Sequence, residues 1–157
     1  MERILSNEQC NNLLLSVKDK LWERVDRFGK YDQVFISDEE VKNTVLSFFN
    51  KDLAAPPILK VIKLSKGDNI PTFSADYSNK EDEYFKRYID TNFIIQIYLN
   101  DNFEGGVLSK AGTPLSPKAG YGIIQNKTDK CSLSAVSKGE AYFLFIFISK
   151  LKTSSLL

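Results

Sequence analysis

The segment FIIQIYLNDNFEGG, residues 93–106, carries the clearest structural signal in the chain. Its apolar residues alternate with a period of two along one face of a strand: Phe93, Ile95, Ile97 and Leu99. Ile94 and Tyr98 make the opposite face apolar as well, so we expect both faces of this strand to be buried. A strand of this kind is typical of the middle of a jelly roll.

Two glycines, Gly105 and Gly106, follow this strand after a short acidic turn. Glycine adopts positive φ angles without steric cost, and a tight corner between strands often requires them. We therefore expect Gly105 or Gly106 to have a positive φ at a strand corner.

Two helices are predicted near the N-terminus. Ser6 and Gln9 have the spacing of a capping box. An apolar stripe with helical spacing follows through Cys10, Leu14, Val17, Leu21 and Val25. Asp38 is expected to cap the second helix, which should end at the prolines in residues 54–57 because proline cannot continue a helix.

Short apolar or alternating runs between Gly, Pro and Asn turns make up the rest of the chain. The expected strands span residues 33–36, 58–64, 71–75, 92–99, 106–109, 120–125, 132–136 and 141–149. This pattern predicts an α+β fold dominated by a sandwich or jelly roll and supported by N-terminal helices. The length of 157 residues, without a repeat or a linker, predicts one domain over residues 1–157.

The bulk composition excludes several classes of protein. A net charge of +1 provides no field for nucleic acid or for a membrane surface, and no apolar run has the length of a membrane span. The first ten residues lack the apolar core of a secretion signal, and the two cysteines are expected to be reduced thiols. These features favour a cytoplasmic protein, and none of them indicates an oligomeric state.

The chain contains no histidine. Imidazole is the most common nitrogen ligand of catalytic zinc, iron and copper, and the usual general base near neutral pH. The standard serine–histidine, cysteine–histidine and two-histidine-one-carboxylate sites are therefore excluded.

Four segments in the right order resemble the prolyl-hydroxylase branch of the iron/2-oxoglutarate oxygenases. Residues 93–106 resemble a family strand ending in YLN, with a short acidic turn and GG after it, and PKAG at residues 117–120 resembles a turn before a central strand. AVSKG at residues 135–139, with the apolar run after it, is similar to the last two core strands, and residues 4–10 resemble the opening helix. The resemblance spans residues 4–149 and implies a double-stranded β-helix.

The resemblance also implies where an iron site would lie. In the family, a His-x-Asp pair and a distal histidine hold the metal. The pair falls at Phe73 and Ala75, or, shifted by one residue, at Ser74 and Asp76, and the distal histidine falls at Cys131. The ligands are therefore missing in whole or in large part. We therefore expect no cofactor. We also expect side chains to fill the metal position, with Phe73 or its neighbour pointing inward.

The family's second anchor is a basic residue on the last core strand, which pairs with the far carboxylate of 2-oxoglutarate. This position falls at Ala141, so the anchor is also expected to be lost. Ordinary structural roles explain the other positions: Phe73 as a core aromatic, Cys131 as a small buried hydrophobic residue, and Asp76 as a turn cap.

A prolyl-hydroxylase-like chain without these residues is predicted to be a catalytically inactive protein-binding module. It would sequester or inhibit a protein partner, and a viral protein that engages host factors is one such case. Residues 77–91 match a loop that encloses substrate in the hydroxylases, and they contain the expected partner-binding residues: Tyr84, Phe85, Lys86, Arg87 and Tyr88. The same aromatic residues are also consistent with a purely structural role, in which they pin the loop to the barrel.

Two other functions stay open on the sequence alone. One is a divergent oxygenase or other metal enzyme with a non-standard site drawn from Asp76, Glu81, Glu83 and Cys131. The other is small-ligand binding inside the barrel, as in cupin-like proteins.

Overall fold

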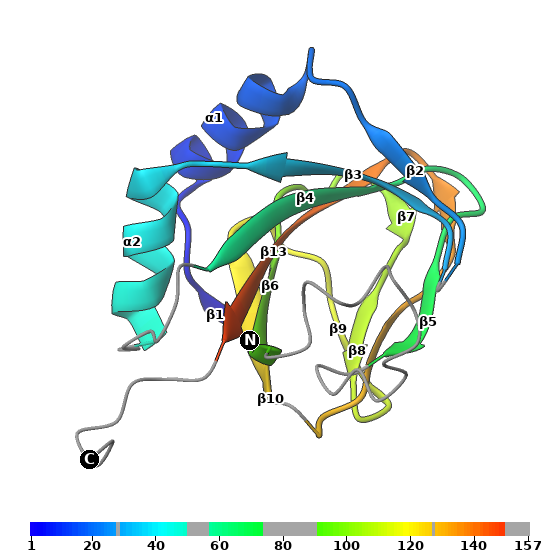
Figure 1. Cartoon of the computed structure of the whole chain (residues 1–157). Coiled ribbons are helices and arrows are strands. Elements are labelled where there is room, and N and C mark those ends of the chain that lie inside the picture. The colour runs from blue at the N-terminus through cyan, green and yellow to red at the C-terminus, as the bar shows by residue number, and fades with distance from the viewer. Residues whose placement is uncertain (28, 50–56, 74–90, 127, 150–157) are drawn as a thin grey trace.

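The computed structural model describes residues 1–27, 29–49, 57–73, 91–126 and 128–149. Strands form a large sheet and a smaller one that face each other, and both helices lie on the outer side of the large sheet (Figure 1). The large sheet has seven strands in the order β1 (Glu2–Arg3), β10 (Tyr121–Asn126), β6 (Thr91–Tyr98), β13 (Ala141–Ser149), β4 (Ile58–Leu64), β3 (Tyr31–Ile36) and β2 (Glu23–Val25).

The smaller sheet has four strands, and a separate strand pair closes one end. Its order is β5 (Ile70–Phe73), β11 (Cys131–Leu133), β8 (Leu108–Lys110) and β9 (Thr113–Leu115), and the pair is β12 (Val136–Lys138) with β7 (Glu104–Gly105). The chain passes from one sheet to the other between β4 and β5, again before β6, and again after it. This alternation is the topology of a double-stranded β-helix, so the predicted jelly roll with N-terminal helices is confirmed.

Two apolar clusters fill the space on either side of the large sheet. The inner core lies between the sheets and consists of Val25, Tyr31, Ile62, Leu64, Ile70, Ile94, Tyr98, Leu108, Cys131, Leu133, Val136, Ala141, Phe143, Phe145 and Phe147. The outer core lies under the helices and consists of Ile4, Leu5, Cys10, Leu13, Val17, Val34, Val41, Val45, Leu59, Val61, Ile95, Ile97, Leu99, Leu144, Ile146 and Ile148. The prediction that the strand at residues 93–99 is buried on both faces is therefore confirmed for Ile94 to Leu99.

Helix α1 (Asn7–Val17) is shorter than the sequence pattern predicts. Its capping box is present, with the Ser6 hydroxyl accepting from the Gln9 backbone and the Gln9 side chain accepting from the Ser6 backbone. The extension of the apolar stripe to Val25 is wrong, because Leu21 is 95% exposed and Val25 ends strand β2.

Long-range contacts explain why the helical pattern fails after residue 17. Strand β2 pairs with β3, and Arg24 donates two hydrogen bonds of 2.8 Å to the two carboxylate oxygens of Asp68. This bidentate pair fixes Arg24 in an extended segment at the edge of the sheet. The local sequence pattern gives no information on this contact, because Asp68 is 44 residues away from Arg24 along the chain.

Helix α2 (Glu39–Phe49) begins as predicted, since the Asp38 carboxylate accepts a hydrogen bond of 3.0 Å from the Val41 backbone. Its predicted end in residues 54–57 lies almost wholly outside the described residues. Each helix has 11 residues, and no helix in the described part of the chain is long and apolar enough to cross a membrane.

Several strand boundaries differ from the expected ones. The expected strand at residues 106–109 coincides with β8 only from residue 108 onward, since β7 ends at Gly105. The expected strand at residues 132–136 is divided between β11 and β12. Strands β1, β2 and β9, each of two or three residues, were not predicted. Strands this short are stabilised by pairing with their neighbours and leave little periodicity in the sequence.

The predicted glycine corner is confirmed at both positions. Gly105 has φ +77° and Gly106 has φ +58°, and Gly105 is paired with Val136 across the two-stranded sheet. A Cβ atom at residue 105 would overlap the Ala135 carbonyl oxygen. Both the backbone angle and the close approach of β12 therefore require glycine at position 105.

We predict that Gly105→Ala lowers the free energy of unfolding by about 3 kcal/mol, because a strained φ angle and a backbone overlap act together. Gly112→Ala is the matched control, since Gly112 has φ +82° but no atom within 4 Å of an added Cβ. The control should lose only the free energy that the positive φ angle costs an alanine, about 1 kcal/mol. Denaturant titration measures both values, and equal losses would contradict the proposed close approach.

Candidate functional site

The candidate site is the part of the barrel interior where β5 of the small sheet ends. Phe73, the last residue of β5, is the register partner of Cys131, the first residue of β11. The Phe73 ring packs against the inner core and stacks on Phe145, with ring centroids 6.1 Å apart and an interplanar angle of 29°. Phe73 thus contacts the barrel interior, while its assignment to the metal position stays a prediction.

Cys131 is buried, with 2% of its surface exposed. Burial raises the pKa of the Cys131 thiol to about 11, and the nearby Gln96 amide and Lys110 ammonium lower it by smaller amounts. The sulfur is therefore a neutral thiol at physiological pH. A thiol is a much weaker metal ligand and nucleophile than a thiolate.

Ala141 begins β13 and is completely buried in the inner core. Its register partner is Leu64 of β4, so both residues at this point of the barrel wall are apolar. Ser74, Ala75 and Asp76, the other positions of the expected metal site, lie outside the described residues. The expected partner-binding residues 84–88 also lie outside them, as do Glu81 and Glu83.

A buried amide network beside Phe73 was not predicted from the sequence. Gln96 lies between Ile94 and Tyr98 of the inner core, and its Nε2 donates a hydrogen bond of 2.6 Å to Gln125 Oε1. Gln125 Nε2 donates to the Phe73 carbonyl at 3.1 Å and to the Asp129 carbonyl at 2.9 Å. The network thus connects β6 and β10 of the large sheet to the end of β5.

Gln96 also carries an unused acceptor. Its Oε1 is buried and has no hydrogen-bond partner among the described residues. An amide inside an alternating apolar strand is uncommon, because a buried polar group needs a partner. Gln96 in the run FIIQIY was therefore a sequence signal that pointed to the barrel interior.

Lys60 is a further polar residue of the barrel wall, with 3% of its surface exposed. Its neighbours in β4, Ile58 and Ile62, contact the inner core, so the lysine side chain lies on the same face. Lys60 Nζ donates a hydrogen bond of 2.9 Å to Gln33 Oε1 and lies 4.9 Å from the centroid of the Phe147 ring. Gln33 Nε2 in turn donates to Glu23 at 2.5 Å.

Tyr98, the last residue of β6, links the two sheets. Its hydroxyl donates a hydrogen bond of 2.7 Å to the Leu115 carbonyl and accepts one of 2.6 Å from the Leu108 backbone. Burial raises the pKa of the Tyr98 hydroxyl to about 12, so it is neutral at physiological pH. Tyr98 therefore holds β8 and β9 against the large sheet.

Comparison with solved structures gives consistent neighbours for this arrangement. A Pseudomonas putida prolyl-4-hydroxylase superposes with a TM-score of 0.71 at 10% identity, over 96% of this chain and 90% of that chain. The viral collagen prolyl hydroxylase of Paramecium Bursaria Chlorella virus-1 superposes with a TM-score of 0.68 at 17% identity, over 94% and 93% of the two chains. The chain has the prolyl-hydroxylase fold. A 2-oxoglutarate-Fe(II) oxygenase family protein of Burkholderia pseudomallei superposes with a TM-score of 0.59 at 15% identity, over 90% of this chain and 79% of that one.

Sequence comparisons add no further relatives. No protein-family model matches the chain, and no curated protein sequence matches it. The likeness to the prolyl hydroxylases is therefore one of fold.

Among the described residues, those at the positions that the resemblance assigns to metal ligands, Phe73 and Cys131, do not fit a ferrous site. A ferrous site of that kind needs two imidazoles and a carboxylate with open positions beside them. The described wall offers a phenyl ring at Phe73 and a protonated thiol at Cys131, and the chain has no histidine. No group of three His, Cys, Asp or Glu side chains that could hold a metal occurs among the described residues.

We predict that Cys131 contributes to stability in a pH-dependent way. Its folded-state pKa of about 11 lies above the ordinary thiol value of 9.0, so folding favours the protonated thiol. The stabilisation is fully present below pH 9 and is lost as the pH rises towards 11. Cys131→Val should therefore lose less unfolding free energy between pH ~8 and pH ~10.5 than the wild type.

Denaturant titration at the two pH values measures this difference. Cys10→Val provides a second, independent case, because burial also raises the pKa of the Cys10 thiol to about 11. The same pH-dependent loss in the wild type and in Cys131→Val would show that the Cys131 thiol does not titrate as described.

Proposed function

We propose that this protein is a catalytically inactive prolyl-hydroxylase-like domain that binds a protein partner. The observation that carries the proposal is the stack of Phe73 on Phe145 opposite Cys131, in the position where the resemblance assigns metal ligands. The stack fills this part of the interior with apolar side chains. An aromatic pair contributes to core stability through its buried area and its ring contact.

The wall where the co-substrate would be anchored supports the same proposal. The position assigned to the basic residue is Ala141, which is buried between apolar neighbours and carries no charge. A dicarboxylate in this place would lose its hydration without gaining an ion pair from residue 141. This loss of hydration free energy would disfavour 2-oxoglutarate binding whether or not a metal were held nearby.

A partner for such a protein would be one that related enzymes act upon or work with. One neighbour in fold is described as a collagen prolyl hydroxylase, so a proline-containing protein segment is one candidate ligand. The jelly roll retains the framework of that fold, and both sheets are tied by Tyr98 and the Gln96–Gln125 network. We place the partner contact in residues 84–88 on composition alone, since aromatic residues and arginine are enriched at interface hot spots.

A divergent metal enzyme is the alternative, and its support is that the fold neighbours are enzymes of the oxygenase family. Of the residues considered for such a site, only Cys131 is described, and its high pKa makes it a poor ligand. Metal and co-substrate titration separates this alternative from the proposal.

We predict that anaerobic titration of the purified protein with Fe(II) and 2-oxoglutarate produces no metal-to-ligand absorption band. The physical reason is the missing imidazoles and the apolar wall at Phe73 and Ala141. An active prolyl-4-hydroxylase treated in the same way is the positive control. A saturable band, with succinate formed after oxygen is admitted, would establish the divergent oxygenase and overturn the proposal.

We predict that the double variant Phe85→Ala, Arg87→Ala weakens binding of a partner captured from a cell lysate by roughly tenfold or more. Its melting temperature should equal that of the wild type if the two side chains form an interface. Phe48→Ala with Lys42→Ala, on helix α2, is the control that removes an aromatic and a cation elsewhere. A lowered melting temperature would instead support a pinning role, and full binding by a stably folded double variant would exclude these residues from the interface.

A further inference from the structure

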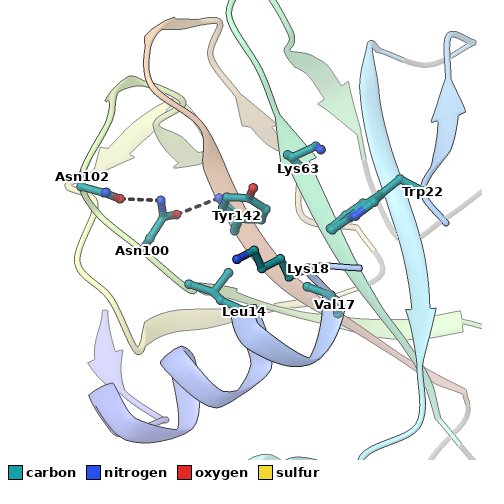
Figure 2. A pocket seen from close by; sticks show the side chains of 8 residues that line it. All are labelled: Leu14, Val17, Lys18, Trp22, Lys63, Asn100, Asn102 and Tyr142. Atoms are coloured by element: carbon teal, nitrogen blue, oxygen red, sulfur yellow. Dashed lines mark hydrogen bonds between the residues drawn. The ribbon is translucent and has the colours of Figure 1, made fainter. Parts of the chain in front are cut away.

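A cavity of about 260 Å³ lies on the outer side of the large sheet, beside the last turn of α1. Figure 2 shows side chains from five parts of the fold arranged around it: α1 with its C-terminal cap, the segment before β2, strand β4, strand β13, and the loop after β6. Lys63 lies between Ile62 and Leu64, which both face the inner core, so its side chain points to the opposite face of the sheet. The cavity is therefore separate from the barrel interior, and its capacity to bind a ligand does not depend on the proposed function.

Two aromatic side chains and two aliphatic ones give the cavity an apolar wall. Trp22 and Tyr142 meet edge to face, with ring centroids 6.2 Å apart and an interplanar angle of 61°. Leu14 and Val17 of α1 complete this wall. Drug-sized ligands occupy pockets of roughly 300–1,000 Å³, so a cavity of this size suits a ligand with a single ring.

The polar groups that line the cavity are mainly hydrogen-bond donors. Lys18 is the C-terminal cap residue of α1, and Lys63 of β4 has its Nζ 4.8 Å from the centroid of the Trp22 ring. Asn102 uses its Oδ1 to accept a hydrogen bond of 2.7 Å from Asn100, while its Nδ2 has no acceptor among the described residues. Two ammonium groups and an amide N–H favour an anionic ligand.

Nearby carboxylates only partly balance these cations. Within the described part of the chain, no Asp or Glu lines the cavity. Asp32 lies 3.9 Å from Lys63 and 3.6 Å from Arg24, so its single charge is shared between two cations at long distance. The Glu140 carboxylate accepts a hydrogen bond of 3.4 Å from Ser65.

Asn100 holds one side of the cavity in a fixed geometry. Its Nδ2 donates to the Glu140 carbonyl at 2.8 Å. Its Oδ1 accepts a hydrogen bond of 2.8 Å from the Tyr142 backbone (Figure 2). Both atoms of this amide are therefore used within the protein. Asn100 acts as a positioning residue that fixes Asn102 and the start of β13 relative to each other.

We propose that this cavity binds a small aryl carboxylate, with the ring against Trp22 and Tyr142 and the carboxylate near Lys18 and Lys63. The apolar wall accounts for the ring, and the two ammonium groups with the Asn102 amide account for the charge. The same chemistry occurs in free aromatic acids and at the end of a peptide whose last residue is phenylalanine. Parallel titrations with a free acid and with such a peptide distinguish these two sources.

Trp22 is the only tryptophan of the chain, so its fluorescence reports on the cavity wall alone. Phenylacetate should cause a saturable change in Trp22 emission. Phenylacetamide has the same ring without the charge, so its affinity should be lower by about tenfold or more. A short peptide that ends in phenylalanine is titrated in parallel, and its affinity relative to phenylacetate identifies the source. If the emission does not change, the NMR resonance of the Trp22 indole N–H can follow the same titrations.

Lys18→Gln and Lys63→Gln should each weaken phenylacetate binding by about fivefold to tenfold, since each removes one charge-assisted contact. Lys20→Gln is the matched control, because Lys20 is an exposed lysine of the same segment that does not line the cavity. Lys18 is exposed, so its replacement should leave the melting temperature unchanged. Equal binding of the acid and the amide, no saturable signal by either method, or the same affinity in Lys18→Gln, Lys63→Gln and Lys20→Gln would each overturn the proposal.

Discussion

The pairing of β13 with β6 on one side and with β4 on the other is the constraint on which the rest of the structure depends. Phe143, Phe145 and Phe147 of β13 face the inner core, and the residues between them face the outer core. A strand that is apolar on both faces must be covered on both, because each exposed large side chain would forfeit about 1.5–3 kcal/mol of burial. The small sheet provides one cover and the two N-terminal helices provide the other.

Polar bridges then fix how the small sheet lies on the large one. Tyr98 reaches from β6 to the backbones of β8 and β9, and the Gln96–Gln125 pair reaches to the end of β5. Buried polar groups are costly when unpaired, so each bridge allows few alternative placements of the sheets. The positions of Phe73 and Cys131 relative to each other are a consequence of these bridges as much as of the strand register. The candidate site is thus shaped by residues that lie beside it.

The sequence predicted those parts of the fold that depend on neighbours along the chain. The caps at Ser6 and Asp38, the long strands, and the positive φ angles at the glycine corner all follow from local patterns. Helix α1 was predicted too long because Arg24 meets a carboxylate 44 positions away, which no local pattern contains. The resemblance to the hydroxylases gave the inward placement of Phe73, whereas the amide network became visible only with both sheets in place. The cavity at Trp22 could not be predicted, because its lining comes from separate segments that only the folded sheet brings together.

The edges of the two main sheets have a further consequence for how copies of the protein meet. The large sheet ends in β1 and β2, which have two and three residues and expose the charged side chains of Glu2, Arg3, Glu23 and Arg24. The small sheet ends in β5 and β9, and each of these contains a proline, Pro71 or Pro114, that lacks the amide hydrogen needed for a ladder. Short, charged or proline-containing edges are poor templates for strand addition. Among the described strands, the long apolar ones lie inside the large sheet, and this arrangement disfavours edge-to-edge aggregation.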